Sequence, residues 1–290
     1  MKLNIALVGL GVIGGTFAKA IQAHAPGAYT VAAIDTHEDT LTQATRDGVI
    51  QYGETTNQTI LQNADLVIIS LYPKALKIFL ETHRQDFKPG AIVTETSGIK
   101  QSVIEFIAPH IPPDIDFIFG HPMAGREKQG YAYSDAAVFN HANYLISPTE
   151  TNRRENIDWF SQILKSLGFG RVTEVTASAH DALIGYTSQL THAIAVALMN
   201  SDDTERDTYK YVGDSFRDLT RIANINEYLW SELFLENKEA LLASFETFEH
   251  ELQRLKTAIE TDNIRDMQDI FRQSSQRRLV FETADESRKE

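Results

Sequence analysis

The sequence contains no cysteine among its 290 residues. That absence excludes disulfides, thiol nucleophiles and thiolate metal sites. Basic residues are few relative to acidic ones, because 27 Lys and Arg against 40 Asp and Glu give a formal net charge of −13. A negative overall field repels phosphate backbones and anionic membranes, so nucleic acid is not an expected partner.

Long hydrophobic runs and linker segments are lacking as well. No run approaches the roughly 18 apolar residues that a membrane span needs, and no cleavage pattern follows the apolar N-terminus. We therefore expect a cytoplasmic protein without a membrane partner. No repeat, low-complexity tract or Pro/Gly-rich linker interrupts the chain, and 42% hydrophobic residues suffice for the cores of two domains.

Short β-rich apolar runs alternate with helix-like segments up to about residue 175. Single helix-length connections between strands are typical of parallel pairing with helical crossovers. The pattern predicts an α/β domain over residues 1–175, with a doubly wound Rossmann-type parallel sheet. The predicted strands cover residues 3–9, 29–35, 64–70, 90–96, 116–120, 143–147 and 170–175.

The remaining residues, 176–290, show only helical patterns and predict an all-α domain. Apolar residues in one stretch recur at alternating spacings of four and three, which is an a/d seam. A helix with this seam should pack lengthwise on another helix, and the spacing leaves open whether that helix belongs to the same chain. The seam consists of Leu241, Phe245, Phe248, Leu252, Leu255 and Ile259.

A glycine-rich turn follows the first predicted strand. It reads Gly9-Leu10-Gly11-Val12-Ile13-Gly14, with the spacing G-x-G-x-x-G, and it opens a predicted helix. Such a turn brings backbone N–H groups close to a pyrophosphate at the helix N-terminus. The second strand ends in Asp35, whose carboxylate suits a ribose hydroxyl. The other interpretation is that the glycines only turn the chain and that Asp35 caps a helix.

The cofactor expected from this turn is NAD. Thr36 and His37 follow Asp35, and no arginine stands directly beside it to receive a 2′-phosphate. Arg46 and His37 keep NADP open as an alternative.

His121 stands at the end of the predicted strand 116–120, in the segment GHPMAGREKQG. The carboxyl edge of such a sheet is where ligands bind, and Pro122 restricts the backbone of the residue before it. With an ordinary pKa near ~6.5, a histidine suits proton removal from a hydroxyl. It is a candidate base, and a structural loop histidine is the alternative.

Two further groups of polar residues lie in the helical part. Asp181, Gly185, Ser188 and His192 fall on one helical stripe, which is either a solvated face or a covered one with a ligand or partners. No H-E-x-x-H pattern, P-loop or close histidine pair occurs, so no metal site is expected.

Arg217 and Arg221 lie one helical turn apart, with Trp230 nearby. Guanidinium groups in that arrangement suit a carboxylate. Surface ion pairs with Asp218 or Glu227 are the alternative.

Six segments together resemble the prephenate dehydrogenase family, which also includes arogenate-using members. The resemblance spans about residues 3–280 and rests on these segments, in order: GLGVIGG, SGIK, GHPMAGREKQG, SQLTHAIAVAL, FRDLTRIA and LWSELFLENKEAL. The resemblance implies NAD-dependent oxidative decarboxylation of prephenate to 4-hydroxyphenylpyruvate in tyrosine biosynthesis. It also implies a homodimer formed by the helical half.

The resemblance further implies roles for single residues. His121 accepts the proton of the ring hydroxyl, and Arg221 holds a substrate carboxylate. The other substrate-site residues that the resemblance implies are Ser188, His192, Trp230 and Glu127. Of these, Glu127 gates or orders the pocket.

The chain departs from the family pattern at two positions. Family members often read G-S-x-K, whereas this chain reads Ser97-Gly98-Ile99-Lys100, so the candidate catalytic hydroxyl of Ser97 comes one residue earlier. Arg126 stands where many relatives have serine or threonine. As a substrate-binding residue it would bind the side-chain carboxylate and favour the dicarboxylate prephenate.

Three other functions compete with this one. An arogenate dehydrogenase would give tyrosine directly with the same chemistry. A β-hydroxyacid dehydrogenase would use a lysine where this chain offers Ser188 and His192. A non-catalytic nicotinamide-binding regulator would need the glycine turn but not His121.

Overall fold

The computed structural model describes residues 2–125, 130–203 and 205–286. Its contacts divide the chain into two compact units, one ending at Lys238 and the other beginning at Glu239. The first unit contains the sheet together with the helices up to residue 236. A domain boundary after residue 175 falls in the connection between a strand and a helix of this unit, and it stays a prediction.

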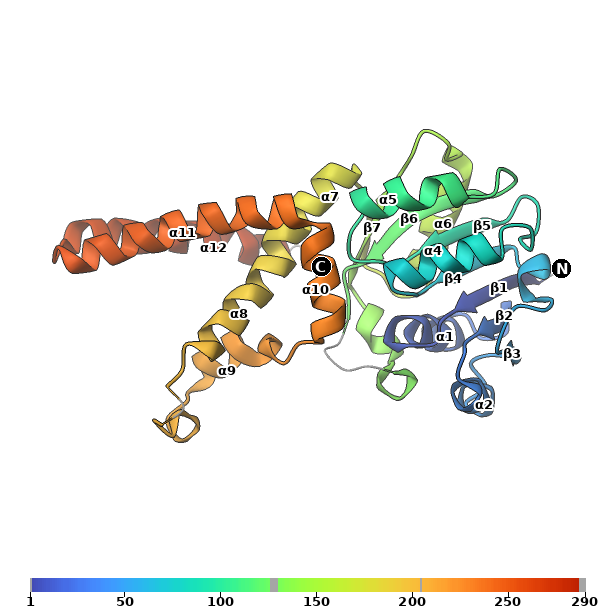
Figure 1. Cartoon of the computed structure of the whole chain (residues 1–290), viewed down its shortest axis with the longest axis horizontal. Helices are drawn as coiled ribbons and strands as arrows, with labels where there is room; N and C mark the ends of the chain where they lie inside the picture. The colour runs from blue at the N-terminus through green and yellow to red at the C-terminus, as the bar shows by residue number, and fades with distance from the viewer. Residues whose placement is uncertain (1, 126–129, 204, 287–290) are drawn as a thin grey trace. The chain divides into compact units, whose positions relative to one another are not determined.

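The first unit is built on an eight-stranded sheet in the order β3-β2-β1-β4-β5-β6-β7-β8 (Figure 1). Apolar residues dominate the central strands because both faces of the sheet are covered by helices. The predicted doubly wound α/β fold is confirmed. The strands are β1 Leu3–Val8, β2 Tyr29–Ile34, β3 Tyr52–Glu54, β4 Leu66–Ile69, β5 Ile92–Glu95, β6 Asp116–Pro122, β7 Asn143–Ser147 and β8 Arg171–Glu174.

Two features of the sheet differ from the sequence prediction. Strand β3 was not predicted, since three residues are too few to show an apolar pattern. Strand β7 runs antiparallel to β6, whereas all other neighbouring strands are parallel. The described part of the β6–β7 connection holds only the short 3₁₀ turns η2 (Tyr131–Tyr133) and η3 (Ala136–Phe139), so no crossover helix carries the chain back to a parallel start.

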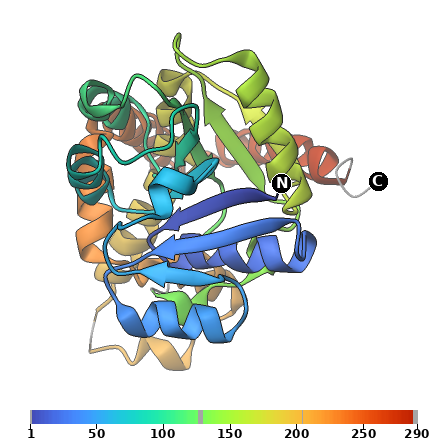
Figure 2. The ribbon, with the colours of Figure 1, turned by 90° about the vertical axis from the view of Figure 1, so that its right-hand side faces the viewer.

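Helices cover the sheet in two layers, as Figure 2 shows. Helices α1, α2 and α6 bury residues in one apolar cluster, and α3, α4 and α5 bury residues in the other. Pro73 is the first residue of α4, where its missing N–H costs no hydrogen bond. The helices are α1 Val12–His24, α2 Glu38–Arg46, α3 Ile60–Asn63, α4 Pro73–Thr82, α5 Gln101–Ile107 with the turn η1 Ala108–His110, and α6 Arg154–Ser166.

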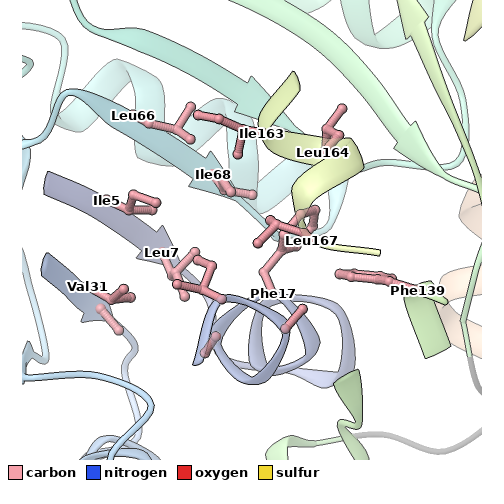
Figure 3. Packing of buried hydrophobic residues seen from close by; sticks show 14 of the residues in the cluster. Ile5, Leu7, Phe17, Val31, Leu66, Ile68, Phe139, Ile163, Leu164 and Leu167 are labelled. Atoms are coloured by element: carbon pink, nitrogen blue, oxygen red, sulfur yellow. The ribbon is translucent and has the colours of Figure 1, made fainter. Parts of the chain in front are cut away.

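The first apolar cluster fixes the glycine turn. Phe17 of α1 is fully buried against Phe139 and near Leu7 of β1, as Figure 3 shows. Burial of a side chain of this size stabilises the fold by roughly 1.5–3 kcal/mol. Strand β1 and helix α1 are thus held together on both sides of the turn that joins them.

The first unit continues into helices at its C-terminal side. Residues 177–200 form one uninterrupted helical stretch that is long and apolar enough, by composition, to cross a membrane. The sequence was not expected to contain such a stretch, although the central helix of a bundle reaches the same composition. Its polar residues His180, Asp181 and Gln189 are buried within the unit. The elements are α7 Ala177–Ile184, the π-helical segment η4 Gly185–Gln189, α8 Leu190–Asn200, η5 Thr208–Lys210, α9 Asp214–Thr220, η6 Arg221–Ala223 and α10 Glu227–Glu236.

The second unit contains α11 (Lys238–Glu260) from its second residue onward and α12 (Ile264–Glu286). Arg254 donates a hydrogen bond from Nη1 to Oε1 of Gln273 at 3.1 Å, which joins the two helices side by side. The described residues after Glu174 contain no strand, as predicted.

The predicted seam of α11 is only partly covered within one chain. Leu241 is buried, whereas Leu252 is 54% and Ile259 is 58% exposed.

Candidate active site

The glycine turn after β1 has the geometry of a phosphate-binding loop. Gly9 has φ 82°, and a Cβ atom on it would lie 2.7 Å from the backbone oxygen of Ser70. A Cβ on Gly14 would lie 1.9 Å from the backbone oxygen of Gly9, so α1 approaches the turn as closely as it does only because residue 14 is glycine. Gly11 is the N-cap of α1, and among the described residues no neighbouring atom lies within 4 Å of a Cβ placed on it, so the turn is open there. The residues therefore fit a pyrophosphate.

Asp35 is tied to the same turn. Its Oδ2 accepts a hydrogen bond from the backbone N–H of Leu10 at 2.7 Å, and its Oδ1 accepts one from the N–H of His37 at 2.9 Å. A carboxylate held in this way, at the end of β2, suits the hydroxyls of an adenosine ribose. The turn and Asp35 together fit NAD, which supplies a hydride acceptor when it is bound.

His121 lies at the carboxyl end of β6, between β5 and β7 in the sheet. It is partly buried, and its Nδ1 lies 2.9 Å from Nε2 of His180 in α7. His180 is fully buried, and its Nδ1 lies 2.7 Å from Oδ1 of Asp181. Three side chains from a strand and a helix thus form one hydrogen-bonded chain.

The chain of hydrogen bonds fixes which nitrogen of His121 carries the proton. A carboxylate only accepts, so Nδ1 of His180 donates to Asp181. The Nε2 of a neutral His180 then accepts, and Nδ1 of His121 is the donor to it. The lone pair of His121 is left on Nε2, where it can accept a proton.

Both imidazoles are held in the neutral form. Burial lowers the pKa of His121 well below its ordinary value of 6.5, and the positive charges of His180 and Lys100 would lower it further. Burial also lowers the pKa of His180, although the hydrogen bond to Asp181 opposes part of that shift. His121 is therefore an unprotonated base at neutral pH.

Asp181 is itself fixed by the start of α5. Its Oδ1 accepts a hydrogen bond from the N–H of Lys100 at 2.8 Å, and its Oδ2 accepts one from the N–H of Gln101 at 2.7 Å. Amide groups hold the other side, because Asn237 donates to the backbone oxygen of Asp181 at 2.9 Å and to Oε1 of Gln189 at 2.8 Å. The chain of hydrogen bonds therefore rests on a rigid frame.

A buried ion pair lies beside this chain. Nζ of Lys100 is 2.9 Å from Oε1 of Glu95, and both side chains are at most 1% exposed. The ammonium also donates to the backbone oxygens of Ser97 at 2.7 Å and Ile99 at 3.1 Å. Burial lowers the pKa of Lys100, and the Glu95 carboxylate opposes part of that shift. The ion pair and these additional hydrogen bonds offset part of the free-energy cost of burying the ammonium.

The hydroxyl of Ser97 belongs to this ion pair. It donates to the Glu95 carboxylate and accepts a hydrogen bond from Lys100 at 3.3 Å, and the residue is buried. Gly98 is the residue beside the base, since a Cβ atom on it would lie 3.8 Å from Nε2 of His121. A direct catalytic role for Ser97 stays a prediction.

Helix α10 connects the base to the other predicted site residues. The same Cβ position on Gly98 lies 3.8 Å from Cδ2 of Leu233, one turn along α10 from Trp230. The rings of Trp230 and His192 have centroids 3.8 Å apart. Nδ1 of His192 lies 2.8 Å from the backbone oxygen of Ser188, which is in the π-helical segment. His121, Trp230, His192 and Ser188 therefore belong to one region.

The remaining predicted residues are placed as follows. Arg221 is exposed in η6, which packs against α8. Its neighbour Arg217 forms a surface ion pair with Asp214 at 2.9 Å. Arg126 and Glu127 lie outside the residues that the structure describes. Among the described residues no group of three His, Cys, Asp or Glu side chains could hold a metal ion.

Three residues of the site were missed in the sequence: His180, Glu95 and Lys100. A signal was present for His180 and Glu95. A His-Asp dipeptide at 180–181 interrupts an otherwise apolar helix, and Glu95 directly ends a fully buried strand. Polar residues in such places need partners, and the carboxyl ends of neighbouring parallel strands meet at one edge.

Comparisons with known proteins agree with this arrangement. Residues 17–173 match the family described as "Prephenate dehydrogenase, nucleotide-binding domain", and residues 176–273 match "Prephenate dehydrogenase, dimerization domain". The chain is 26% identical over 277 residues to prephenate dehydrogenase of Bacillus subtilis, covering 94% of this chain and 73% of that one. It is 29% identical over 288 residues to cyclohexadienyl dehydrogenase of Zymomonas mobilis, covering 97% and 96%.

Two solved structures of dehydrogenases have folds similar to that of this chain. Prephenate dehydrogenase from A. aeolicus, in complex with hydroxyphenyl propionate and NAD+, superposes with a TM-score of 0.87 at 25% identity, covering 97% of this chain and 99% of that one. Synechocystis arogenate dehydrogenase shares the fold, with a TM-score of 0.81 at 23% identity over 96% and 100% of the two chains.

A dinucleotide-binding turn and a histidine fixed as a proton acceptor on one sheet edge define a dehydrogenase with an appended helical domain. The two domain matches cover most of its length. The chain belongs to the prephenate dehydrogenase family, as its sequence motifs predict.

Proposed function

We propose that the chain catalyses the NAD-dependent oxidative decarboxylation of prephenate to 4-hydroxyphenylpyruvate, a step of tyrosine biosynthesis. The observation that carries the proposal is the hydrogen-bonded chain from Asp181 through His180 to His121, which leaves Nε2 of His121 as the proton acceptor. The names of the relatives from Bacillus subtilis and Zymomonas mobilis support the same reaction.

The reaction needs one base and a fixed substrate. Nε2 of His121 takes the proton of the ring 4-hydroxyl as the same carbon gives up its hydride. The ring carboxylate then leaves as carbon dioxide, its electron pair completes the aromatic ring, and the phenolate oxygen takes back the proton from His121. Aromatisation makes the reaction strongly downhill, so the residues mainly orient the reacting groups.

Substrate binding falls to residues around the base. Arg221 pairs with a substrate carboxylate, as guanidinium groups do in a bidentate manner. Ser188, His192 and Trp230 line the ring site, and the tilted rings of His192 and Trp230, which are in contact, supply an aromatic wall. The roles proposed for Glu127 and Arg126 rest on the sequence alone.

The test is the appearance of reduced nicotinamide absorbance when the full-length protein and NAD receive prephenate or arogenate in parallel, with NADP as the cofactor control. We expect turnover with prephenate and NAD. The variant His121→Asn should bind NAD normally and lose turnover by roughly 10² or more. Near-normal turnover of that variant would refute the role of His121. Absence of turnover by the wild type with both substrates would refute the proposed reaction.

Arogenate is the alternative substrate, and the same assay decides between the two. Both substrates carry two carboxylates, and arogenate carries an ammonium group where prephenate has a keto group. Arg126 is the residue that favours prephenate, because a guanidinium repels that ammonium. Turnover with arogenate alone would keep the chemistry and overturn the substrate.

We also propose that the protein is a homodimer. Apolar side chains of α11 and α12 stay exposed within one chain, and a helical pair of this length does not keep such a surface in water. Apolar side chains are also exposed in α7, η4 and α8, where Leu183 is 51%, Tyr186 is 59% and Met199 is 41% exposed. A second copy of the chain is the partner that the dimerization domain match supports.

A further inference from the structure

The hydrogen-bonded chain from Asp181 through His180 to His121 joins two elements that are distant in the sequence. His121 is on β6 and His180 on α7, 59 residues later, yet their nitrogens are 2.9 Å apart. The rings meet at an interplanar angle of 59°, with centroids 5.1 Å apart. Because His180 is fully buried, this contact is its connection to the site and not to solvent.

We propose that His180 and Asp181 are positioning residues, which hold His121 in the Nδ1–H tautomer and aim its Nε2 at the substrate hydroxyl. The proposal rests on the proposed function only for the identity of that hydroxyl. The tautomer and the orientation follow from the hydrogen bonds alone.

Asp181 determines which atom donates and which accepts in each of these hydrogen bonds. Both carboxylate oxygens accept backbone N–H groups of residues 100 and 101, so the carboxylate cannot rotate away from His180. If the hydrogen bonds ran the other way, Nε2 of His121 would carry a proton and would face the substrate as a donor. Such a tautomer cannot remove a proton.

Titratable groups lie around His121 on two parts of the chain. Helix α7 contributes His180 and the Asp181 carboxylate, and the segment after β5 contributes Lys100 paired with Glu95. The Asp181 carboxylate lies at one end of the chain of hydrogen bonds, and the imidazole of His121, which becomes positive on taking the proton, lies at the other end. The carboxylate therefore acts on His121 through His180, and the two residues set the orientation of the base.

Two substitutions at residue 180 separate positioning from packing. His180→Phe keeps an aromatic ring of similar size but removes the acceptor for His121. His180→Gln retains one acceptor and one donor, so it can still link His121 to Asp181. We expect His180→Phe to lower kcat by about 10- to 10²-fold with little change in the KM for NAD, the scale seen when a partner that orients a functional histidine is lost. His180→Gln should recover most of that loss.

The second readout is the ring ¹⁵N NMR spectrum of histidine-labelled full-length protein, assigned with His121→Asn. It reports the tautomer of His121 without requiring activity. The wild type should show His121 with Nδ1 protonated and Nε2 bare, His180→Gln should keep this pattern, and His180→Phe should show a mixture of tautomers.

The outcomes decide the proposal independently of the substrate. If His180→Phe keeps both the wild-type tautomer and the wild-type kcat, the proposal is wrong. Equal losses of kcat in the Phe and Gln variants, with an unchanged tautomer, would also overturn it, because packing alone would then explain them. A wild type with the expected tautomer but no turnover on prephenate or arogenate would refute the proposed function and leave the tautomer assignment standing.

Discussion

The indole of Trp230 lies against the imidazole of His192, with ring centroids 3.8 Å apart and an interplanar angle of 31°. The contact joins α10 to α8, and both residues are partly buried. A hydrogen bond between Nδ1 of His192 and the backbone oxygen of Ser188 fixes the imidazole in that position. Aromatic pairs of this kind contribute about 0.5–1.5 kcal/mol beyond the area that they bury.

Trp230→Ala should therefore raise the KM for the substrate by roughly 3- to 10-fold, which corresponds to that energy. Trp230→Phe keeps an aromatic face and should have a smaller effect. The matched control is Trp159→Phe, because Trp159 packs against the apolar cluster of the sheet and not in this region. Steady-state kinetics measure all three variants, and an unchanged KM in Trp230→Ala would remove Trp230 from the substrate site.

Gly98 leaves space for a side chain next to the base. A Cβ atom there meets Nε2 of His121 and Cδ2 of Leu233 at 3.8 Å each, which is ordinary contact distance. Gly98→Ser would place a hydroxyl beside Nε2, where it can bond to the substrate hydroxyl, and one hydrogen bond contributes about 0.5–1.5 kcal/mol. We expect the KM for the substrate to fall by roughly 2- to 10-fold.

Gly98→Ala is the control for the added bulk, and it should not lower the KM. Ser97→Ala tests the neighbouring hydroxyl. Since that hydroxyl bonds to Glu95 within a buried ion pair, its loss should lower the free energy of unfolding by about 1–3 kcal/mol. A lower KM in both Gly98 variants would show that volume, and not the hydroxyl, is responsible.

The sequence predicts the sheet and the cofactor turn well because both depend on local patterns. Continuous apolar runs identify buried strands, and the spacing of Gly9, Gly11 and Gly14 identifies the turn. The position of His121 at a strand end also follows from local signals. The antiparallel β7 does not, since its direction depends on what connects it to β6.

The frame around the base depends on tertiary contacts and could not be predicted in the same way. Asp181 reads as part of one helical stripe to which His180 does not belong. Their partners, Lys100 and His121, come from a loop and a strand more than 50 residues earlier. The π-helical segment also shifts the wheel between Asp181 and Ser188, which a period of 3.6 residues does not anticipate.

The exposed apolar residues of α11 and α12 predict the effect of single charges on assembly. Leu252 is 54% and Phe271 is 55% exposed within one chain, so Leu252→Asp and Phe271→Asp cost the isolated chain little. Each should weaken the homodimer, because a carboxylate buried in an apolar interface is unpaired.

Light scattering coupled to size-exclusion chromatography measures the mass of the assembly that each variant forms in solution. The wild type and the control Gln253→Asp, a substitution at an exposed polar residue of α11, should elute with the mass of two chains. The two apolar-to-Asp variants should elute as one chain or as a concentration-dependent mixture. A wild type with the mass of one chain would disprove the dimer.

The neutral state of His121 and His180 should make stability depend on pH. Burial lowers the pKa of both imidazoles in the folded chain, below the value of about 6.5 that applies in the unfolded chain. Between these values the unfolded chain binds protons that the folded chain does not, so the free energy of unfolding falls as the pH falls through 6.5. Each histidine contributes a slope of up to about 1.4 kcal/mol per pH unit.

Urea unfolding of the full-length protein at pH 7.5, 6.5 and 5.5, at one fixed protein concentration, measures this slope. The paired carboxylates Glu54 and Asp65 have lowered pKa values and lose their contribution only at more acidic pH, so they do not account for a slope in this range. His121→Asn removes one of the two imidazoles, so the slope should fall by up to about 1.4 kcal/mol per pH unit. A stability that stays constant from pH 7.5 to 5.5 would mean that the imidazoles take up protons in the folded chain, and the base would then be charged where the reaction needs it neutral.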